Sequence, residues 1–416
     1  MKCLLGITWQ LKMMETTAPR TAVVIGGGIA GCSTAYMLAK RNIHVTLIER
    51  HSALAMEASG NPVAVLYPRL TGRDTVLEKL NVQGYLFTLQ LLQELGLARC
   101  NYSACGVIQL AIEPQQHIKN TFVAGKYGDQ FFRNQNSAEL SKLAGVTLKH
   151  PGLYFQKAGG INLAHLCAVL TKQPTIEVLT NTQALNIKRV ADSWQVDAES
   201  KTIVQTDIVV IANAYDATQF QQSAHISLTA TRGQLTNLQA TEASKNLKTI
   251  LCGEGYISPA ANDLHCLGAT FSHHDDDMSI RATDHADNLE LLKKMSPDLY
   301  ENLQNNTVSG RVAWRSQTTD YLPAAGQLLD IDTLQNNRYF YNDSPDKLPF
   351  ADGLYANVGH GAKGFLSAPL CAETIAAHAT NENTRIPIAL RNALQPNRFV
   401  LRKMGLKLLA QHLITA

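Results

Sequence analysis

Three glycines near the start of the chain have the spacing of a nucleotide-binding turn. Gly26, Gly28 and Gly31 form Gly-x-Gly-x-x-Gly directly after the apolar run 21–25. The first glycine permits a tight turn, the second lets a pyrophosphate approach the backbone, and the third lets a helix pack against a strand. The N–H groups at the start of that helix would then bind the phosphates. The spacing therefore predicts a dinucleotide site.

An acidic residue stands where the ribose of such a dinucleotide would lie. Glu49 ends a second apolar run, 44–48, and a carboxylate there can accept hydrogen bonds from both ribose hydroxyls. The same carboxylate would repel a 2′-phosphate, which argues against NADP. The motif occurs once and no redox cysteine pair accompanies it, so the pattern is not that of a disulfide reductase. These residues alone leave NAD and FAD open.

A strand, a helix and a second strand must position these residues. The apolar, β-branched runs 21–25 and 44–48 are typical of buried parallel strands, and small apolar residues at 32–41 predict the helix between them. Further strands are expected at 106–112, 176–179, 194–197 and 207–212, and further helices at 78–95, 163–172 and 286–295.

Composition excludes several classes of protein. With 416 residues, 45% hydrophobic and 17% charged, the chain can bury a large core and should form two or three domains. A wholly disordered or collagen-like chain is excluded. The eight cysteines are scattered without metal-ligand spacing, as expected of reduced thiols in a cytoplasmic protein without zinc. No apolar run approaches the ~20 residues that cross a bilayer, so no membrane association is expected.

A second glycine-rich segment comes late in the chain. Residues 357–364 read Asn-Val-Gly-His-Gly-Ala-Lys-Gly. With residues 21–49, this segment resembles the D-amino-acid-oxidase and glycine-oxidase superfamily. The resemblance implies FAD as cofactor, and a late loop that opens a helix over 367–379 whose N–H groups and dipole face the flavin. A plain glycine-rich turn is the alternative interpretation.

The resemblance also implies an α/β fold with two discontinuous domains. One would be a Rossmann-type FAD-binding domain and the other a mixed-sheet substrate domain, as in D-amino-acid oxidase. A leader or linker remnant would precede them, a surface loop would cover 335–349, and a basic tail would follow. The expected bounds are 20–98, 155–222 and 350–382 for the FAD domain, 99–154 and 223–349 for the substrate domain, 1–19 for the leader and 383–416 for the tail.

Three short blocks give a finer resemblance. Residues 58–62 (Ala-Ser-Gly-Asn-Pro), 367–370 (Ser-Ala-Pro-Leu) and 396–398 (Pro-Asn-Arg) resemble the FAD-dependent oxidoreductase half of the bifunctional tRNA 5-methylaminomethyl-2-thiouridine biosynthesis proteins. Two positions depart from that pattern, because Lys363 replaces an arginine and Ala64 a glycine. The resemblance implies oxidation of 5-carboxymethylaminomethyl-(2-thio)uridine at the tRNA wobble position, which releases glyoxylate and leaves 5-aminomethyl-(2-thio)uridine.

The resemblance implies partners as well. The substrate would be tRNA. Only about twenty residues precede the first strand, too few for the methyltransferase half of these proteins, so a methyltransferase would be a separate chain. The stretch 383–416 carries six basic and no acidic residues, which suits RNA phosphates but is also found on solvated helix faces.

Candidate substrate contacts follow from the same resemblance. Arg315 would hold the substrate carboxylate, because its planar fork binds two oxygens at once. Lys363 would touch the carboxylate or the flavin edge, and Tyr256 would close the pocket. Purely structural roles remain open for all three, and His360 is a weaker candidate for acid–base work.

The FAD is expected to be held without a covalent bond, because neither Cys nor His occurs at 57–62 or at Ala313. The residues expected at the cofactor are Gly26, Gly28, Ile29, Ala30, Gly31, Glu49, Arg50, Ala58, Ser59, Gly60, Asn61, Ala212, Asn213, Gly361, Ala362, Lys363 and Gly364.

Two other functions remain open. A small-molecule amine oxidase acting on glycine or sarcosine would share every flavin motif. A non-catalytic flavoprotein scaffold would bind FAD without oxidising an amine. Site chemistry rather than fold must separate the three.

Overall fold

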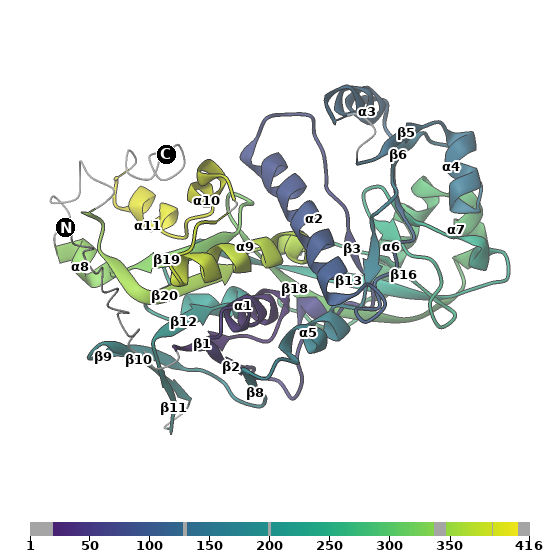
Figure 1. Cartoon of the computed structure of the whole chain (residues 1–416). Helices are drawn as coiled ribbons and strands as arrows, with labels where there is room; N and C mark the ends of the chain where they lie inside the picture. Colours follow the sequence, from purple (N-terminus) through teal and green to yellow (C-terminus); the bar gives the residue numbers. More distant parts are fainter. Residues whose placement is uncertain (1–19, 128–130, 199–200, 337–346, 385, 407–416) are drawn as a thin grey trace, which may run out of the picture.

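The computed structural model describes residues 20–127, 131–198, 201–336, 347–384 and 386–406 (Figure 1). The predicted leader, most of the predicted loop at 335–349 and the last ten residues of the tail lie outside these ranges.

The first glycine motif belongs to a six-stranded sheet. Its order is β19-β20-β12-β1-β2-β8, and all neighbours are parallel except β19 and β20. The central strands are wholly apolar and buried, because helices cover one face and a small sheet covers the other. The strands are β1 (Thr21–Ile25), β2 (His44–Ile48), β8 (Ile176–Leu179), β12 (Ile208–Ile211), β19 (Ala324–Leu329) and β20 (Phe350–Val358).

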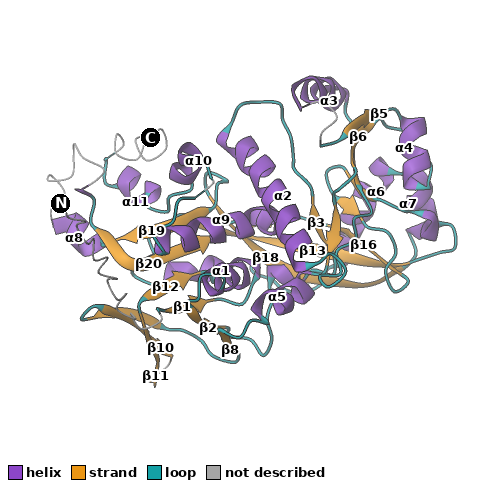
Figure 2. Cartoon of the chain, viewed as in Figure 1, coloured by secondary structure: helices purple, strands orange, loops and turns teal. Residues whose placement is uncertain are grey.

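Three helices lie on one face of this sheet, and a fourth, α2, packs on α9 (Figure 2). The four are α1 (Ile29–Ala39), α2 (Val76–Leu95), α5 (Leu163–Thr171) and α9 (Gly364–Ala379). Helix α1 is apolar all round and nearly all of it is buried, since α5 and α9 pack on its sides. It begins three residues earlier than the sequence predicts, because Gly28 is already the extended residue that caps it.

A three-stranded antiparallel sheet covers the opposite face. It consists of β9 (Asn186–Val190), β10 (Ser193–Ala198) and β11 (Lys201–Thr206). Trp194 and Val196 of β10 share a core with Val23 and Ile211 of the central strands. The six-stranded sheet is therefore the middle layer of three.

The second half of the molecule is built on a nine-stranded mixed sheet. Its order is β17-β13-β16-β15-β14-β4-β6-β5, with β18 paired to β13. The strands are β4 (Val107–Leu110), β5 (Arg133–Gln135), β6 (Gly152–Phe155), β13 (Leu228–Gln239), β14 (Ile250–Cys252), β15 (Tyr256–Ile257), β16 (Leu264–Gly268), β17 (Ser272–His273) and β18 (Thr307–Thr318). Strands β3 (Ala64–Leu66) and β7 (Gly159–Ile161) form a separate pair.

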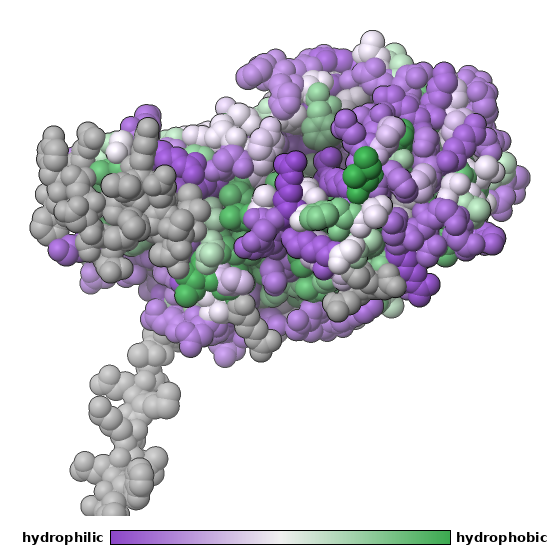
Figure 3. Space-filling view, turned by 90° about the horizontal axis from the view of Figure 1, so that it is seen from above, coloured by the Kyte–Doolittle hydropathy of each residue, from purple (hydrophilic) through white to green (hydrophobic). Residues whose placement is uncertain are grey.

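Helices accompany the second sheet and the end of the chain. Helices α4 (Ser137–Ala144), α6 (Ala282–Met295) and α7 (Pro297–Leu303) share its core, and α3 (Pro114–Tyr127) follows β4. Seen from above, hydrophilic side chains cover most of this half (Figure 3). Helices α8 (Ile331–Asn336), α10 (Ile388–Ala393) and α11 (Arg398–Lys403) lie near β19 and β20.

The described part of the basic tail is folded into the protein. Arg398 is fully buried and makes two hydrogen bonds to the Asp320 carboxylate, at 2.9 and 2.8 Å. Asn397 is also buried, and its Oδ1 accepts a hydrogen bond from the Leu329 N–H at 3.0 Å. The expectation that this block contacts RNA phosphates is therefore wrong for Arg398, which holds α11 to the loop before β19.

The described residues contain neither a membrane-spanning helix nor a cluster of metal ligands. No helix there is both long and apolar enough to cross a membrane. No group of three or more His, Cys, Asp or Glu side chains there is arranged to hold a metal ion.

Candidate functional site

The turn between β1 and α1 has the geometry that its glycines predict. Gly26 has a φ of +108°, and a Cβ there would lie 2.7 Å from the carbonyl oxygen of Ala212. A Cβ on Gly31 would lie 1.8 Å from the Gly26 oxygen, so only glycine lets the helix pack this close. At Gly28 the nearest atom would be the Ser59 hydroxyl, 3.2 Å away. The middle glycine thus leaves room for a ligand to approach the backbone.

Glu49 is buried at the end of β2 and holds the turn in place. One carboxylate oxygen accepts a hydrogen bond from the Gly27 N–H at 2.6 Å, and the other accepts one from the His51 N–H at 2.8 Å. Each oxygen keeps a lone pair for a further donor. The neighbouring Arg50 is less buried and pairs with Asp216 at 2.5 Å and Glu57 at 2.9 Å.

The segment 56–61 is fastened to the second sheet by an arginine of β18. Arg311 donates hydrogen bonds to Asn61 Oδ1 at 2.9 Å, to the Met56 oxygen at 2.8 Å and to the Glu57 oxygen at 2.5 Å. A Cβ on Gly60 would lie 2.6 Å from Arg311 Nη2, so the glycine makes room for this contact.

The same segment also reaches the first helix. The Ser59 hydroxyl accepts a hydrogen bond from the Ile29 N–H at 3.0 Å, at the start of α1. Segment 56–61 therefore connects the six-stranded sheet with the nine-stranded one.

The late glycine loop comes back beside the first helix. His360 Nε2 lies 3.0 Å from Asn357 Oδ1, and Asn357 Nδ2 donates to Thr34 Oγ1 of α1 at 3.0 Å. This orientation of the amide requires the proton on Nε2. His360 Nδ1 lies 2.9 Å from the Ser367 hydroxyl of α9. With both ring nitrogens engaged and burial lowering its pKa to about 4, His360 is a neutral structural link between α1 and α9.

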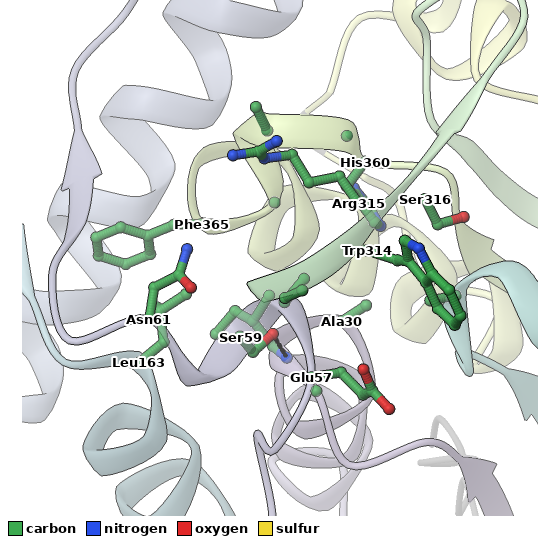
Figure 4. A pocket seen from close by; sticks show the side chains of 18 of the residues that line it. Ala30, Glu57, Ser59, Asn61, Leu163, Trp314, Arg315, Ser316, His360 and Phe365 are labelled. Carbon is green, nitrogen blue, oxygen red and sulfur yellow. Dashed lines mark hydrogen bonds between the residues drawn. The ribbon is translucent and has the colours of Figure 1, made fainter. Parts of the chain in front are cut away.

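Both glycine turns line one cavity of about 480 Å³ (Figure 4). It lies between the six-stranded and nine-stranded sheets, and β18 crosses it. Every residue expected at the cofactor or substrate lines it except Gly31 and Gly60, whose part is to let neighbouring groups pack closely. The predicted residues that line it are Gly26, Gly28, Ile29, Ala30, Glu49, Arg50, Ala58, Ser59, Asn61, Ala212, Asn213, Tyr256, Arg315, Gly361, Ala362, Lys363 and Gly364.

Arg315 lies in the cavity with its guanidinium on the opposite side of β18 from Trp314 and Ser316 (Figure 4). Its Nη1 donates to the Thr270 oxygen at 3.0 Å, and the guanidinium carbon lies 4.2 Å from the centre of the Phe271 ring. Burial lowers the pKa of Arg315 to about 10, so it is charged at neutral pH. It forms no ion pair with a carboxylate of the described chain, which leaves the cation for an anionic ligand.

Lys363 and Tyr256 lie in the same cavity but differ in what they can offer. Lys363 Nζ lies 4.1 Å from the centre of the Tyr67 ring, and burial lowers the pKa of Lys363 to about 8. The Tyr256 hydroxyl donates to the Val63 oxygen at 2.8 Å, and burial raises the pKa of Tyr256, so it stays protonated. Lys363 is available to a ligand, whereas the Tyr256 proton is already used to hold the segment before β3.

A family model described as "DAO: FAD dependent oxidoreductase" matches residues 21–378 of this chain. The chain belongs to this family. The match confirms FAD as the cofactor and an oxidoreductase as the class of protein that the two glycine motifs indicate.

Curated relatives match almost the whole chain. The tRNA 5-methylaminomethyl-2-thiouridine biosynthesis bifunctional protein MnmC of Methylobacillus flagellatus is 40% identical over 394 residues, which are 94% of this chain and 61% of that protein. The protein of the same name from Pseudomonas syringae pv. syringae is 38% identical over 404 residues, 95% of this chain and 61% of that protein. The chain thus spans about three fifths of the length of these relatives. The finer resemblance that the three short blocks predict is confirmed.

Solved structures confirm the fold class. Glycine oxidase from Geobacillus kaustophilus superposes with a TM-score of 0.71 at 21% identity, covering 89% of this chain and 97% of that one. L-proline dehydrogenase from P. horikoshii gives 0.74 at 17% identity, covering 93% and 98%. At these identities the likeness shows that this oxidoreductase shares their α/β fold.

The residues of the cavity fit FAD. Helices α1 and α9 both begin there, so two positive helix ends face the space. The backbone at Gly28 is open to a ligand, and Glu49 retains lone pairs for hydroxyl donors. Asn213 Oδ1, also in the lining, is buried without a hydrogen-bond partner in the described structure. Such an orphaned acceptor is expected where a ligand supplies the donor.

Two positioning residues are not predicted from the sequence. Arg311 clamps segment 56–61, and Gly233 of β13 lies beneath Arg315. The residues around Gly233 and Arg311 carry no local signal of these roles, because Arg315 lies on another strand and Asn61, which Arg311 holds, lies 250 residues away along the chain.

Proposed function

We propose that this chain oxidises the carboxymethylaminomethyl group of 5-carboxymethylaminomethyl-(2-thio)uridine at the wobble position of tRNA. The substrate's glycine unit would lose a hydride from its methylene carbon and a proton from its nitrogen, which would give an imine, and bound FAD would supply the two-electron acceptor. Water hydrolyses the imine to glyoxylate and 5-aminomethyl-(2-thio)uridine. The names of the curated relatives support tRNA as the class of substrate, because they are biosynthesis proteins of tRNA 5-methylaminomethyl-2-thiouridine.

One observation carries the choice of substrate group. Arg315 is a cation inside the cavity that has a backbone oxygen and an aromatic ring as neighbours but no described carboxylate. A buried cation is costly unless an anion compensates it. A carboxylate of the substrate would supply that anion, and the planar guanidinium can bind both of its oxygens.

The chain's own residues position the cofactor. We assign the pyrophosphate to the backbone around Gly28 and to the start of α1, and the ribose hydroxyls to Glu49. No covalent attachment is expected, because Ala313 and segment 57–62 offer neither Cys nor His.

Lys363 is proposed as a second cation for the substrate carboxylate or the flavin edge. Its ammonium has a Tyr67 ring beside it, and burial lowers its pKa to about 8. Tyr256 is a positioning residue, since its hydroxyl ties β15 to the segment before β3. A methyltransferase would then act on the primary amine that the reaction leaves.

Anaerobic mixing tests the proposal. The FAD-loaded chain is mixed with tRNA bearing 5-carboxymethylaminomethyluridine, and the flavin absorbance is followed while glyoxylate and the product nucleoside are analysed. Bleaching with this tRNA, but not with the same tRNA lacking the modification, is expected. Bleaching with glycine or sarcosine alone would favour a small-molecule amine oxidase, and bound FAD that no amine reduces would favour a scaffold.

An Arg315→Ala variant tests the carboxylate assignment. Loss of a charged hydrogen bond of ~1.5–3 kcal/mol should lower kcat/KM roughly 10- to 100-fold, while FAD binding is retained. Arg315→Lys keeps a charge without the fork and should fall between the two. Kinetics of Arg315→Ala equal to those of the wild type would discard the assignment.

A further inference from the structure

Three cations lie together on the loop after β3 and on α3, and one of them also lines the cavity. Arg69 and Arg73 are exposed on the loop, and Lys119 is half-buried on α3. Arg69 belongs to the lining of the cavity. None of the three forms an ion pair in the part of the chain that the structure describes, whereas the neighbouring Asp74 pairs with Lys79 at 3.2 Å. We call Arg69, Arg73 and Lys119 the basic rim.

The rim is a group of like charges that affect one another. Burial lowers the pKa of Lys119, the charges of Arg69 and Arg73 lower it further, and the charge of the Glu78 carboxylate opposes this shift. The Arg69 charge also adds to the burial that lowers the pKa of Lys363 inside the cavity. Like charges that act on one another repel, and a bound polyanion would relieve that repulsion.

The loop and α3 are held together as one unit. Glu78 accepts hydrogen bonds from the Thr71 N–H and from the Tyr127 hydroxyl, both at 2.6 Å. Lys126 donates to the Gly72 oxygen at 3.3 Å. The rim is therefore positioned before any ligand arrives, which lowers the entropic cost of binding.

An exposed aromatic ring lies on the same unit. The side chain of Phe122 is 63% exposed, and its ring rests on Gly72, where a Cβ would come within 2.4 Å of Cδ1. In the view from above, isolated hydrophobic side chains interrupt the hydrophilic surface of this half of the molecule (Figure 3). Cations that track phosphates beside an aromatic ring that stacks on a base are the pattern of single-stranded RNA binding.

We propose that the basic rim and Phe122 bind the single-stranded RNA that flanks the modified uridine. The cations hold backbone phosphates and the Phe122 ring stacks on a neighbouring base, while Arg69 joins this surface to the cavity. The proposal rests on the proposed function and specifies which surface recognises the nucleic acid. It also assigns the contacts with RNA phosphates, which were expected of the buried Arg398, to cations that a ligand can reach.

RNA binding tests the surface directly. The probe is a fluorescein-labelled stem-loop RNA with the sequence of the anticodon arm, and its anisotropy is measured over a range of salt concentrations. Arg73→Ala/Lys119→Ala should weaken binding about tenfold or more and lower the slope of log K against log salt by about 1.4, roughly 0.7 for each phosphate contact. Phe122→Ala should weaken binding by roughly tenfold without changing that slope. Phe122→Tyr, which keeps an aromatic ring, should bind the RNA with the wild-type affinity.

A matched control removes two cations elsewhere. Lys142→Ala/Lys172→Ala changes exposed lysines on α4 and at the end of α5, neither of which lines the cavity. This variant should bind the stem-loop as the wild type does. Wild-type binding by Arg73→Ala/Lys119→Ala, or an equal loss in the lysine control, would overturn the proposal.

Turnover separates this proposal from the function on which it rests. The free nucleoside 5-carboxymethylaminomethyluridine should reduce the flavin of Arg73→Ala/Lys119→Ala at the same rate as that of the wild type. With the modified tRNA, the kcat/KM of this variant should fall about tenfold. If wild-type flavin is reduced by neither substrate, the proposed function fails, and the anisotropy result still decides on the surface. An equal fall with nucleoside and tRNA would overturn the rim as an RNA contact.

Discussion

The guanidinium of Arg315 lies directly over Gly233 on the neighbouring strand. A Cβ at Gly233 would come within 2.0 Å of Arg315 Nη1, although the backbone of β13 at this point needs no unusual conformation. Strands β13 and β18 are paired along this stretch, with Thr231 opposite Arg315. The absent side chain of Gly233 therefore decides where the cation lies in the cavity.

Replacing Gly233 by alanine should displace the cation without unfolding the protein. The atom that a Cβ would meet belongs to the end of a flexible side chain, which can rotate away. We expect kcat/KM to fall roughly tenfold or more, because small misplacements of a binding group are costly, while the melting temperature stays within a few degrees. Gly125→Ala is the control, since its Cβ would meet nothing within 4 Å. A large loss of melting temperature together with unchanged kinetics would contradict the idea.

Lys363 should make carboxylate binding depend on pH. Because its pKa is lowered to about 8, Lys363 is charged below that pH and becomes neutral above it. The dissociation constant of acetate, which has no amine to titrate, should rise between pH 7 and 9 when it is followed by the flavin spectrum. Lys363→Arg should remove the dependence, and Lys363→Met should bind acetate weakly throughout. A flat wild-type profile would show that Lys363 does not contact the anion.

Glu49 should control the affinity for FAD. In Glu49→Gln one oxygen becomes an amide that faces either the Gly27 or the His51 N–H, so one acceptor is lost. We expect the dissociation constant for FAD, measured by quenching of flavin fluorescence, to rise at least tenfold, as for a charged hydrogen bond of ~1.5–3 kcal/mol. Glu139→Gln on α4 should leave it unchanged. Equal affinities of Glu49→Gln and Glu139→Gln for FAD would contradict the assignment of the ribose hydroxyls to Glu49.

Arg398 and Arg402 contact the same carboxylate from very different environments. The Arg398 side chain is fully buried and lies 2.8 Å from Asp320, whereas that of Arg402 is 43% exposed and lies 3.2 Å away. Breaking a buried pair costs ~3–5 kcal/mol, and partial exposure of Asp320 favours the low end of that range. Urea unfolding should therefore show a loss of about 3 kcal/mol for Arg398→Ala. Arg402→Ala should cost under about 1 kcal/mol.

The first unit of the fold is predictable because its signals are local. Strands Thr21–Ile25 and His44–Ile48 have the bounds that their apolar runs predict, and the glycines between them perform the expected packing. The sequence also predicts that the glycine-rich segment 357–364 opens a helix, and helix α9 begins at the last of these residues. Both signals need only a few consecutive residues.

The long strands of the second sheet are not predictable in the same way. Strand β13 carries Arg232, fully buried and paired with Asp284 at 2.6 Å, and a charge inside a strand breaks the apolar periodicity that marks one. Strand β18 likewise carries two charged residues, Arg311 and Arg315, that interrupt its apolar periodicity. Their function depends on partners from distant segments, which a local pattern does not contain.

The place of β20 has a consequence for how the protein is made. This strand, Phe350–Val358, lies beside β12 in the sheet that β1 begins, and helix α9 behind it packs on α1. During synthesis, the ribosome therefore makes the nucleotide motif more than three hundred residues before it makes β20 and α9, which complete this half of the fold. Until β20 and α9 are made, the edge of β12 and one side of α1 are exposed, and chaperones would be expected to shield them. Assembly of the coenzyme pocket becomes a late event, and nascent chains that stop short of α9 should be targets for proteolysis.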